Sequence, residues 1–401
     1  MNEPDSSSRT PRLSAVLREG EQVTALELFF DLVFVLALTH CTSLMAEPAS
    51  WLNVLKGLLV LGVLWWSWVG YAWLTSVVDP EEGSVRLVMF AAMAAFLVAA
   101  LCVPRAFGAN ALLFALAYGA VRVAHIGLFW LASRDDDALR HSVRGLAGST
   151  AVGVGLLVVA ALAGGTLQIA IWALALALDG AGPFLFGADG WKLVPSHFAE
   201  RHGAIVIIAL GESIAAIGVG ADSTVGTGVV LGAILGTAVA GALWWLYFDV
   251  VAIVAERRLM KAQEGRERNE IARDSYSYLH MPMVAGIALV AVGVKKTLGH
   301  VGEPLAAVPA VALLGGGAVY LLAHVAFRWR NVHKLSRQRA VAAELLGLLA
   351  WAAVELRPLP LVTLATLAAV LSGVILYEAL RFPELRQRIR SLPKGGGIAP
   401  G

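Results

Sequence analysis

Two acidic residues stand four positions apart near the start of a long apolar stretch of this sequence. Glu27 and Asp31 therefore share one face of the helix that such a stretch predicts. Carboxylates at this spacing repel each other, so either one is protonated or both face a cation. We predict that they line the cytoplasmic end of a polar pathway. The alternative is a buried salt bridge to an arginine on another helix.

A third carboxylate, Glu212, lies roughly ten residues into another apolar stretch, or ~15 Å along a helix. A carboxyl group at that depth in hydrocarbon is costly in either protonation state. Its neighbours Gly211 and Ser213 are small enough to allow close approach. Glu212 is therefore predicted to bind a cation or relay a proton. The alternative is a hydrogen bond between helices that serves packing alone.

Arg122 and His125 are three positions apart and share a face of their predicted helix. Because an arginine stays charged in proteins, Arg122 requires a carboxylate partner. Asp31, Asp179 and Glu212 are the candidates, and a structural ion pair is the favoured interpretation.

Further histidines and charges lie near the ends of predicted helices. His125 and His324 are candidate proton relays, and the alternative is that each is a neutral hydrogen-bond partner. Glu200, Arg201 and His202 are consecutive and precede an apolar stretch. They are predicted either to begin that helix, whose N-terminus favours acidic groups, or to act as a gate.

No residue pattern points to catalysis, a metal or a cofactor, and we predict none of these. His40, His280 and His300 lack the spacing of metal ligands, and the cysteines Cys41 and Cys102 both lie in apolar runs. The net charge of +2 is too small to indicate nucleic-acid binding.

The chain that carries these residues has the composition of a membrane protein. Of its 401 residues, 58% are hydrophobic and 15% are charged, whereas a soluble domain carries roughly 25% charged residues. The charged residues are too few to cover the exterior of a soluble protein. We therefore predict an all-α polytopic membrane protein.

Twelve stretches are long and apolar enough to cross a bilayer, for which about 20 residues suffice. They cover residues 24–45, 52–76, 84–103, 111–132, 145–164, 166–186, 203–221, 227–251, 275–298, 305–328, 338–356 and 358–380. With a cytoplasmic N-terminus, the outside connections hold few of the 31 lysines and arginines, namely Lys56, Arg105, Lys295, Lys296 and Arg357. Basic residues concentrate in cytoplasmic loops, so both termini are predicted to be cytoplasmic.

Similar motifs recur in the same order in the two halves of the chain. The matched pairs are Glu27 with Glu200, Trp65-Trp66 with Trp244-Trp245, His125 with His324, and Asp179 with Glu378. We predict six-helix repeats over residues 24–186 and 203–380, the second containing a cytosolic linker at 252–274. Residues 1–23, 187–202 and 381–401 are the expected cytoplasmic segments. Repeats of six spans are parallel, and transport folds place their pathway between such halves.

Several stretches resemble the bacterial low temperature requirement protein A family (LtrA). They are Glu27-Leu-Phe-Phe-Asp31-Leu-Val-Phe-Val35, Leu64-Trp-Trp-Ser-Trp-Val-Gly-Tyr-Ala-Trp73, Asp79-Pro-Glu-Glu-Gly83, His197-Phe-Ala-Glu-Arg-His-Gly203 and Ala209-Leu-Gly-Glu-Ser213. The resemblance covers nearly the whole chain. It implies a bacterial inner-membrane protein linked by name to growth in the cold, and it brings no substrate.

We therefore expect a channel or secondary transporter for a cation, a proton or a small solute, embedded in the lipid bilayer. The pathway residues would be Glu27, Asp31, Arg122, His125, Glu200, Arg201, His202, Glu212 and His324. A membrane-embedded lipid-modifying enzyme is the first alternative, although no catalytic motif supports it. A sensory or scaffold protein is the second, and the oligomeric state stays open.

Overall fold

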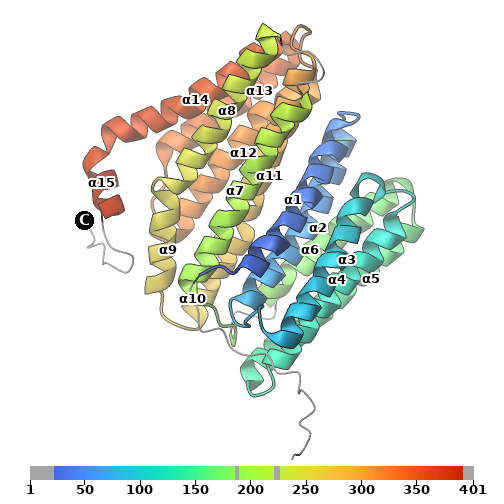
Figure 1. The fold of residues 1–401 in the computed structure, drawn as a ribbon. Coiled ribbons are helices and arrows are strands. Elements are labelled where there is room, and N and C mark those ends of the chain that lie inside the picture. Colours follow the sequence, from blue (N-terminus) through green and yellow to red (C-terminus); the bar gives the residue numbers. More distant parts are fainter. Residues whose placement is uncertain (1–21, 186–188, 221–225, 392–401) are drawn as a thin grey trace, which may run out of the picture.

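The computed structural model describes residues 22–185, 189–220 and 226–391, and within these ranges it contains helices and no β-strand (Figure 1). The first half consists of α1 (Ala25–Ala46), α2 (Trp51–Thr75), α3 (Gly83–Cys102), the short turn η1 (Val103–Arg105), α4 (Ala111–Ala132), α5 (Asp137–Leu162) and α6 (Gly165–Leu185). The second half consists of α7 (Pro195–Gly220), α8 (Thr227–Phe248), α9 (Val251–Lys261), α10 (Arg266–Ile271), the π-helix η2 (Ala272–Tyr278), α11 (His280–Gly299), α12 (Ala307–Val332), α13 (Arg337–Leu356), α14 (Pro360–Arg381) and α15 (Pro383–Ser391). The predicted all-α fold is confirmed.

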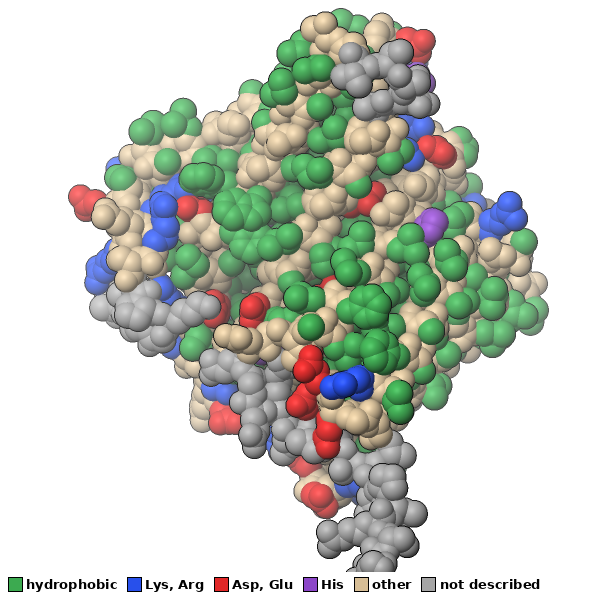
Figure 2. Space-filling view, in the orientation of Figure 1, with side chains coloured by type: hydrophobic (Ala, Val, Ile, Leu, Met, Phe, Trp, Pro, Cys, Tyr) green, Lys and Arg blue, Asp and Glu red, His purple; other side chains and the backbone are tan. Residues whose placement is uncertain are grey.

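The length and composition of these helices identify a multi-pass membrane protein. Within the described ranges, 11 helices are long and apolar enough to cross a bilayer. Apolar side chains such as Leu32, Val123 and Leu162 point outward and are 60–80% exposed, as a lipid-facing surface requires. Figure 2 shows hydrophobic side chains over the flank of the bundle, with charged ones gathered mostly toward its two ends.

The eleventh predicted span, 338–356, forms the helix α13 but differs in composition from the others. Its 20 residues include Arg337, Arg339, Glu344 and Glu355, and it is not among the 11 apolar helices. Arg339 is nevertheless buried inside the bundle. The length predicted for this span was correct, and its charge is accommodated by a partner described below.

Several helices begin earlier than the apolar stretches that predicted them. α5 starts at Asp137 because the side chain of Asp136 accepts a hydrogen bond from the backbone N–H of Leu139 at 3.0 Å. α7 starts at Pro195, so the predicted connector 187–202 already contains two turns of this helix. The predicted tail 381–401 begins with the short helix α15, and its residues 392–401 lie outside the described ranges, as do residues 1–21 of the predicted N-terminal segment.

The two halves use the same order of helix contacts. In the first half, α1 packs against α2 and α3, α3 against α4, α4 against α5, and α6 against both α5 and α2. In the second half, α7 packs against α8 and α11, α11 against α12, α12 against α13, and α14 against both α13 and α8. The halves meet where α1 lies beside α7 and α11 (Figure 1).

Candidate functional site

The first candidate site lies in the seam between α1 and α7, where we call the cluster of Glu27, Asp31, His197 and Arg201 the arginine contact. The two terminal nitrogens of Arg201 lie 3.0 Å from Glu27 and 2.8 Å from Asp31. The Nε2 atom of His197 lies 2.9 Å from the same Glu27 carboxylate. All four side chains are completely buried, so one arginine bridges the two carboxylates that share a face of α1.

Hydrogen bonds from residues other than Arg201 also hold these two carboxylates in place. Glu27 closes a capping box at the start of α1, where its Oε2 accepts a 2.8 Å hydrogen bond from the backbone N–H of Thr24. Asp31 accepts a 2.8 Å hydrogen bond from the indole N–H of Trp68 on α2. Arg201 also donates to Thr75 at 3.2 Å. The arginine contact therefore joins α1, α2 and α7 into one buried network.

Farther along the same seam is a cluster that we call the glutamate contact, formed by Glu212 of α7 with Thr39 and Thr42 of α1. The Thr39 and Thr42 hydroxyls donate to the two carboxylate oxygens of Glu212 at 2.5 and 2.6 Å. Glu212 is only 4% exposed, and no lysine or arginine pairs with it in the described part of the chain. His40 lies close enough to interact electrostatically with the Glu212 carboxylate. Among the described residues, the hydrogen bonds to this carboxylate therefore come from two threonine hydroxyls.

Apolar side chains fill the seam between the two contacts. They include Leu38 of α1 with Ile205, Val206 and Ala209 of α7, and all are buried. The polar residues of the two contacts are thus separated along both helices by an apolar stretch.

The three consecutive residues predicted at the start of this helix have different surroundings. Glu200 is exposed and accepts a long hydrogen bond, 3.4 Å, from the backbone of Val23. Arg201 belongs to the arginine contact. His202 is buried, donates from Nδ1 to the carbonyl of Phe198 at 2.8 Å, and packs against the rings of neighbouring aromatic residues. The earlier start of α7 explains the difference, because it places Arg201 and His202 two turns inside the helix.

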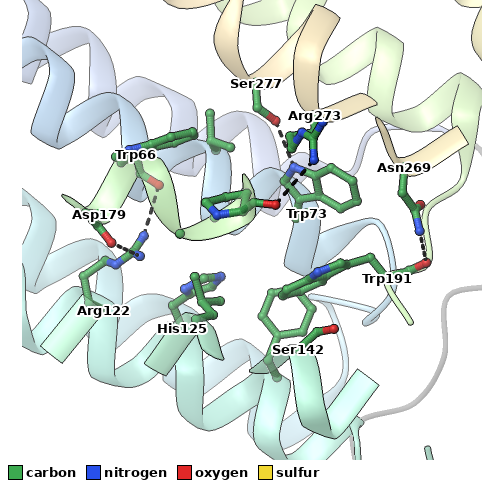
Figure 3. A pocket seen from close by; sticks show the side chains of 16 residues that line it. Trp66, Trp73, Arg122, His125, Ser142, Asp179, Trp191, Asn269, Arg273 and Ser277 are labelled. Atoms are coloured by element: carbon green, nitrogen blue, oxygen red, sulfur yellow. Dashed lines mark hydrogen bonds and ion pairs between the residues drawn. The ribbon is translucent and has the colours of Figure 1, made fainter. Parts of the chain in front are cut away.

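The second candidate site is a cavity of about 80 Å³ between α2, α4, α5 and α6 (Figure 3). Arg122 on its wall lies 3.2 Å from Asp179, and it also donates to Thr150 at 2.6 Å and to the carbonyl of Trp66 at 3.1 Å. Of the three carboxylates that the sequence offered as partners of Arg122, the structure selects Asp179. His125 lines the same cavity one turn away.

The wall of this cavity on the other side comes from the second half of the chain. The π-helix η2 contributes Arg273 and Ser277. Two tryptophans of α2 hold η2 through Ser277. The indole N–H of Trp65 donates to the carbonyl of Ser277 at 2.8 Å, and the indole N–H of Trp73 donates to the hydroxyl of Ser277 at 3.0 Å. Short π-helices occur frequently at functional sites. Sequence reasoning missed this segment, and the only signal was the alternation Ser275-Tyr276-Ser277-Tyr278.

A related cluster occurs in the second half of the chain. Arg339 pairs with both oxygens of Glu378, at 2.8 and 2.9 Å, and donates to Nδ1 of His324 at 2.7 Å. His324 is fully buried and packs 4.5 Å from the ring of Tyr320. The charge within α13 is thus matched by α14.

Asp31, Arg122 and Glu212, three of the predicted pathway residues, do not lie in one contact. Asp31 pairs with Arg201, Arg122 with Asp179, and Glu212 with two threonines. Each of the three groups has its own partner on another helix, which leaves three separate contacts. In the described ranges, no group of three or more histidine, cysteine or acidic side chains is arranged to hold a metal ion.

Comparison with known proteins gives a family and one informative relative. The model of the family described as "Bacterial low temperature requirement A protein (LtrA)" matches residues 22–376. An uncharacterized protein of Rhizobium meliloti (strain 1021) is 33% identical over 309 residues, which cover 74% of each chain. No solved structure matches this chain.

Proposed function

The chain belongs to the bacterial low temperature requirement A family, and from its buried charges we propose that it is a channel or secondary transporter whose pathway follows the α1–α7 seam. The observation that carries the proposal is Glu212, a buried carboxylate that accepts hydrogen bonds from two threonine hydroxyls and pairs with no lysine or arginine of the described residues. A buried ionised carboxylate without a cationic partner is very costly. Glu212 therefore either carries a proton or binds a cation, and each is a step in transport.

The arrangement of the seam supports a route that opens and closes. Ionisable groups inside membrane proteins typically face a bundle interior and mark ion or proton pathways. Here they lie at two levels of one seam, with the apolar stretch between them. In this proposal the arginine contact holds the halves together at one level, while the glutamate contact exchanges its ion when the apolar stretch separates.

Two six-helix repeats are part of this proposal. The equivalent order of helix contacts in the two halves supports a duplication. A recurring set of buried residues also supports a duplication: a histidine, an arginine and a carboxylate of the sixth helix. In the first half these are His125, Arg122 and Asp179. The second half offers His324, Arg339 and Glu378. The arginine comes from the fourth helix in one half and from the fifth in the other, so the contact is retained while its donor has moved.

We further propose that the protein lies in the bacterial inner membrane with both termini in the cytoplasm. The concentration of lysines and arginines in alternate connections supports this orientation. Reporter fusions at Gly20, Arg105, Gln263 and Gly396 are expected to read inside, outside, inside and inside. A reversal at Arg105 or Gln263 would contradict the order of the spans.

The test of transport is a flux measurement on purified protein in liposomes. Gradients of H⁺, Na⁺ and K⁺ are imposed in turn, and at least one is expected to decay faster than in protein-free liposomes. Glu212→Gln keeps the volume and removes the charge, so it should abolish that flux. Glu344→Gln is the matched control, because Glu344 is exposed on α13. Equal flux in the wild type and Glu212→Gln would refute the assignment of Glu212.

A further inference from the structure

The cavity lined by Arg122 and His125 has features that the seam does not explain. Its walls are mainly apolar and aromatic, with the side chains of Trp66, Trp73, Phe129, Leu146 and Trp191 among them. An engineered apolar cavity of about 150 Å³ holds benzene, so a cavity of about 80 Å³ accommodates a smaller apolar group.

Some hydrogen-bonding atoms at this cavity have no partner among the described residues. His125 is 1% exposed, and neither ring nitrogen makes a well-formed hydrogen bond to any described residue. The His125 ring lies against Gly70, because a Cβ atom added to that glycine would lie 2.8 Å from the Cε1 atom of His125. The Nε atom of Arg122 is likewise buried without a partner in the described ranges. Buried donors are normally satisfied, so these two groups indicate a bound acceptor.

The charges around the cavity favour an anionic acceptor. Arg122 meets Asp179 through one 3.2 Å contact. On the opposite wall, Arg273 shares Asp274 with Arg330, at 2.7 and 2.8 Å. The residues that line the cavity therefore include two arginines, Arg122 and Arg273, and one carboxylate, Asp179. Hydrogen bonds from such donors to a carboxylate are roughly twice as strong as those to a neutral group.

The corresponding cluster of the second half is more fully paired, although Nε2 of His324 is also buried without a partner in the described ranges. Both oxygens of Glu378 are bound by Arg339, and the same arginine occupies Nδ1 of His324. Residues of the same types are thus used internally in one half, whereas the first half leaves donors directed at a cavity. Figure 3 shows Arg122 and His125 on one side of that space and Trp73 on the other.

We propose that this cavity binds a small apolar monocarboxylate, with its carboxylate at Arg122 and His125 and its apolar body among the tryptophans. The π-helix η2, anchored by Trp65 and Trp73, closes the site from the other half of the chain. The proposal does not depend on transport along the α1–α7 seam, because binding can be measured without flux.

Equilibrium binding of radiolabelled propionate and butyrate to the full chain in detergent tests the proposal. At least one is expected to bind saturably, and its amide, propionamide or butyramide, to bind at least tenfold more weakly. His125→Leu should weaken binding of the acid at least tenfold. Leu146→Trp, which fills the cavity and leaves the donors in place, should have the same effect. Leu348→Trp is the matched control, since Leu348 is 60% exposed on α13.

Three outcomes would overturn the proposal. One is that folded wild-type protein binds neither acid saturably. Another is that the amide binds as tightly as the acid. The third is unchanged affinity in Leu146→Trp, a variant that remains informative if His125→Leu does not fold. Loss of binding in Leu146→Trp with full binding in Leu348→Trp would support the site.

Discussion

The two contacts of the α1–α7 seam hold buried carboxylates in opposite ways. In the arginine contact, Arg201 lies 3.0 Å from Glu27 and 2.8 Å from Asp31, and His197 lies 2.9 Å from Glu27. In the glutamate contact, Glu212 receives two hydroxyl hydrogen bonds and no lysine or arginine within the described ranges. The comparison teaches that burial alone does not identify a transport residue. A buried carboxylate that is paired with an arginine of the same chain connects helices. A buried carboxylate without such a partner has to acquire a proton or a cation.

The largest effect is expected from breaking the arginine contact. Arg201→Gln leaves two buried carboxylates facing each other, and removing one partner of a buried ion pair typically costs about 3–5 kcal/mol. The measurement is the free energy of unfolding in detergent, or the yield of folded protein. Arg266→Gln is the control, because Arg266 is exposed on α10. Equal stability of the two variants would show that the contact is not structural.

A smaller loss is expected from the glutamate contact when its donor is removed. Thr42→Val takes away the 2.6 Å hydrogen bond to Glu212 and leaves a buried oxygen unsatisfied, at a cost of about 1–3 kcal/mol. Thr366→Val is the control, because that hydroxyl bonds only to Val362 in its own helix. If Thr42→Val were no less stable than Thr366→Val, the hydroxyl would not be needed to hold Glu212.

Glu212→Gln is expected to change stability by less than about 1 kcal/mol, because glutamine retains an oxygen that can accept a threonine hydrogen bond. Unfolding should therefore distinguish it clearly from Arg201→Gln, although it is the variant expected to lose flux. A destabilisation as large as that of Arg201→Gln would place Glu212 among the structural links and remove the difference between the two contacts.

An exposed ion pair provides the smallest expected effect. Lys295, 2.8 Å away, lowers the pKa of Glu47 from its ordinary value of 4.5. A lowered pKa in the folded state stabilises the protein above the ordinary value, and this stabilisation is lost as the pH falls through the lowered pKa. Because Glu47 is 60% exposed, Glu47→Gln should cost only ~0.2–1 kcal/mol near neutral pH. A cost above that of Thr42→Val would contradict this ranking.

The sequence predicted the helices better than the contacts between them. Apolar length alone located the spans, and errors arose where polar first turns extend a helix, as at Asp137 and Pro195. The requirement for a carboxylate near Arg122 followed from its charge, but the choice of Asp179 depends on packing between α4 and α6.

The candidate site was harder to predict, because its partners are distant in the chain. Glu27 and Asp31 lie about 170 positions before their partners in α7, and spacing along one helix says nothing about such pairs. The π-helix η2 was not predicted at all, since its residues also fit the start of an ordinary span. Fixed spacing predicts which residues share a face, whereas their partners follow only from the fold.

Infrared difference spectroscopy tests most directly that Glu212 is the carboxylate that exchanges an ion. Spectra of the protein in lipid are compared between acidic and alkaline buffer, and between buffers with and without Na⁺ or K⁺. We predict a carboxyl signal that disappears in Glu212→Gln and persists in Asp31→Asn and Glu344→Gln. A signal that persists in Glu212→Gln and disappears in Asp31→Asn would contradict the account, because the arginine contact would then be the site of exchange.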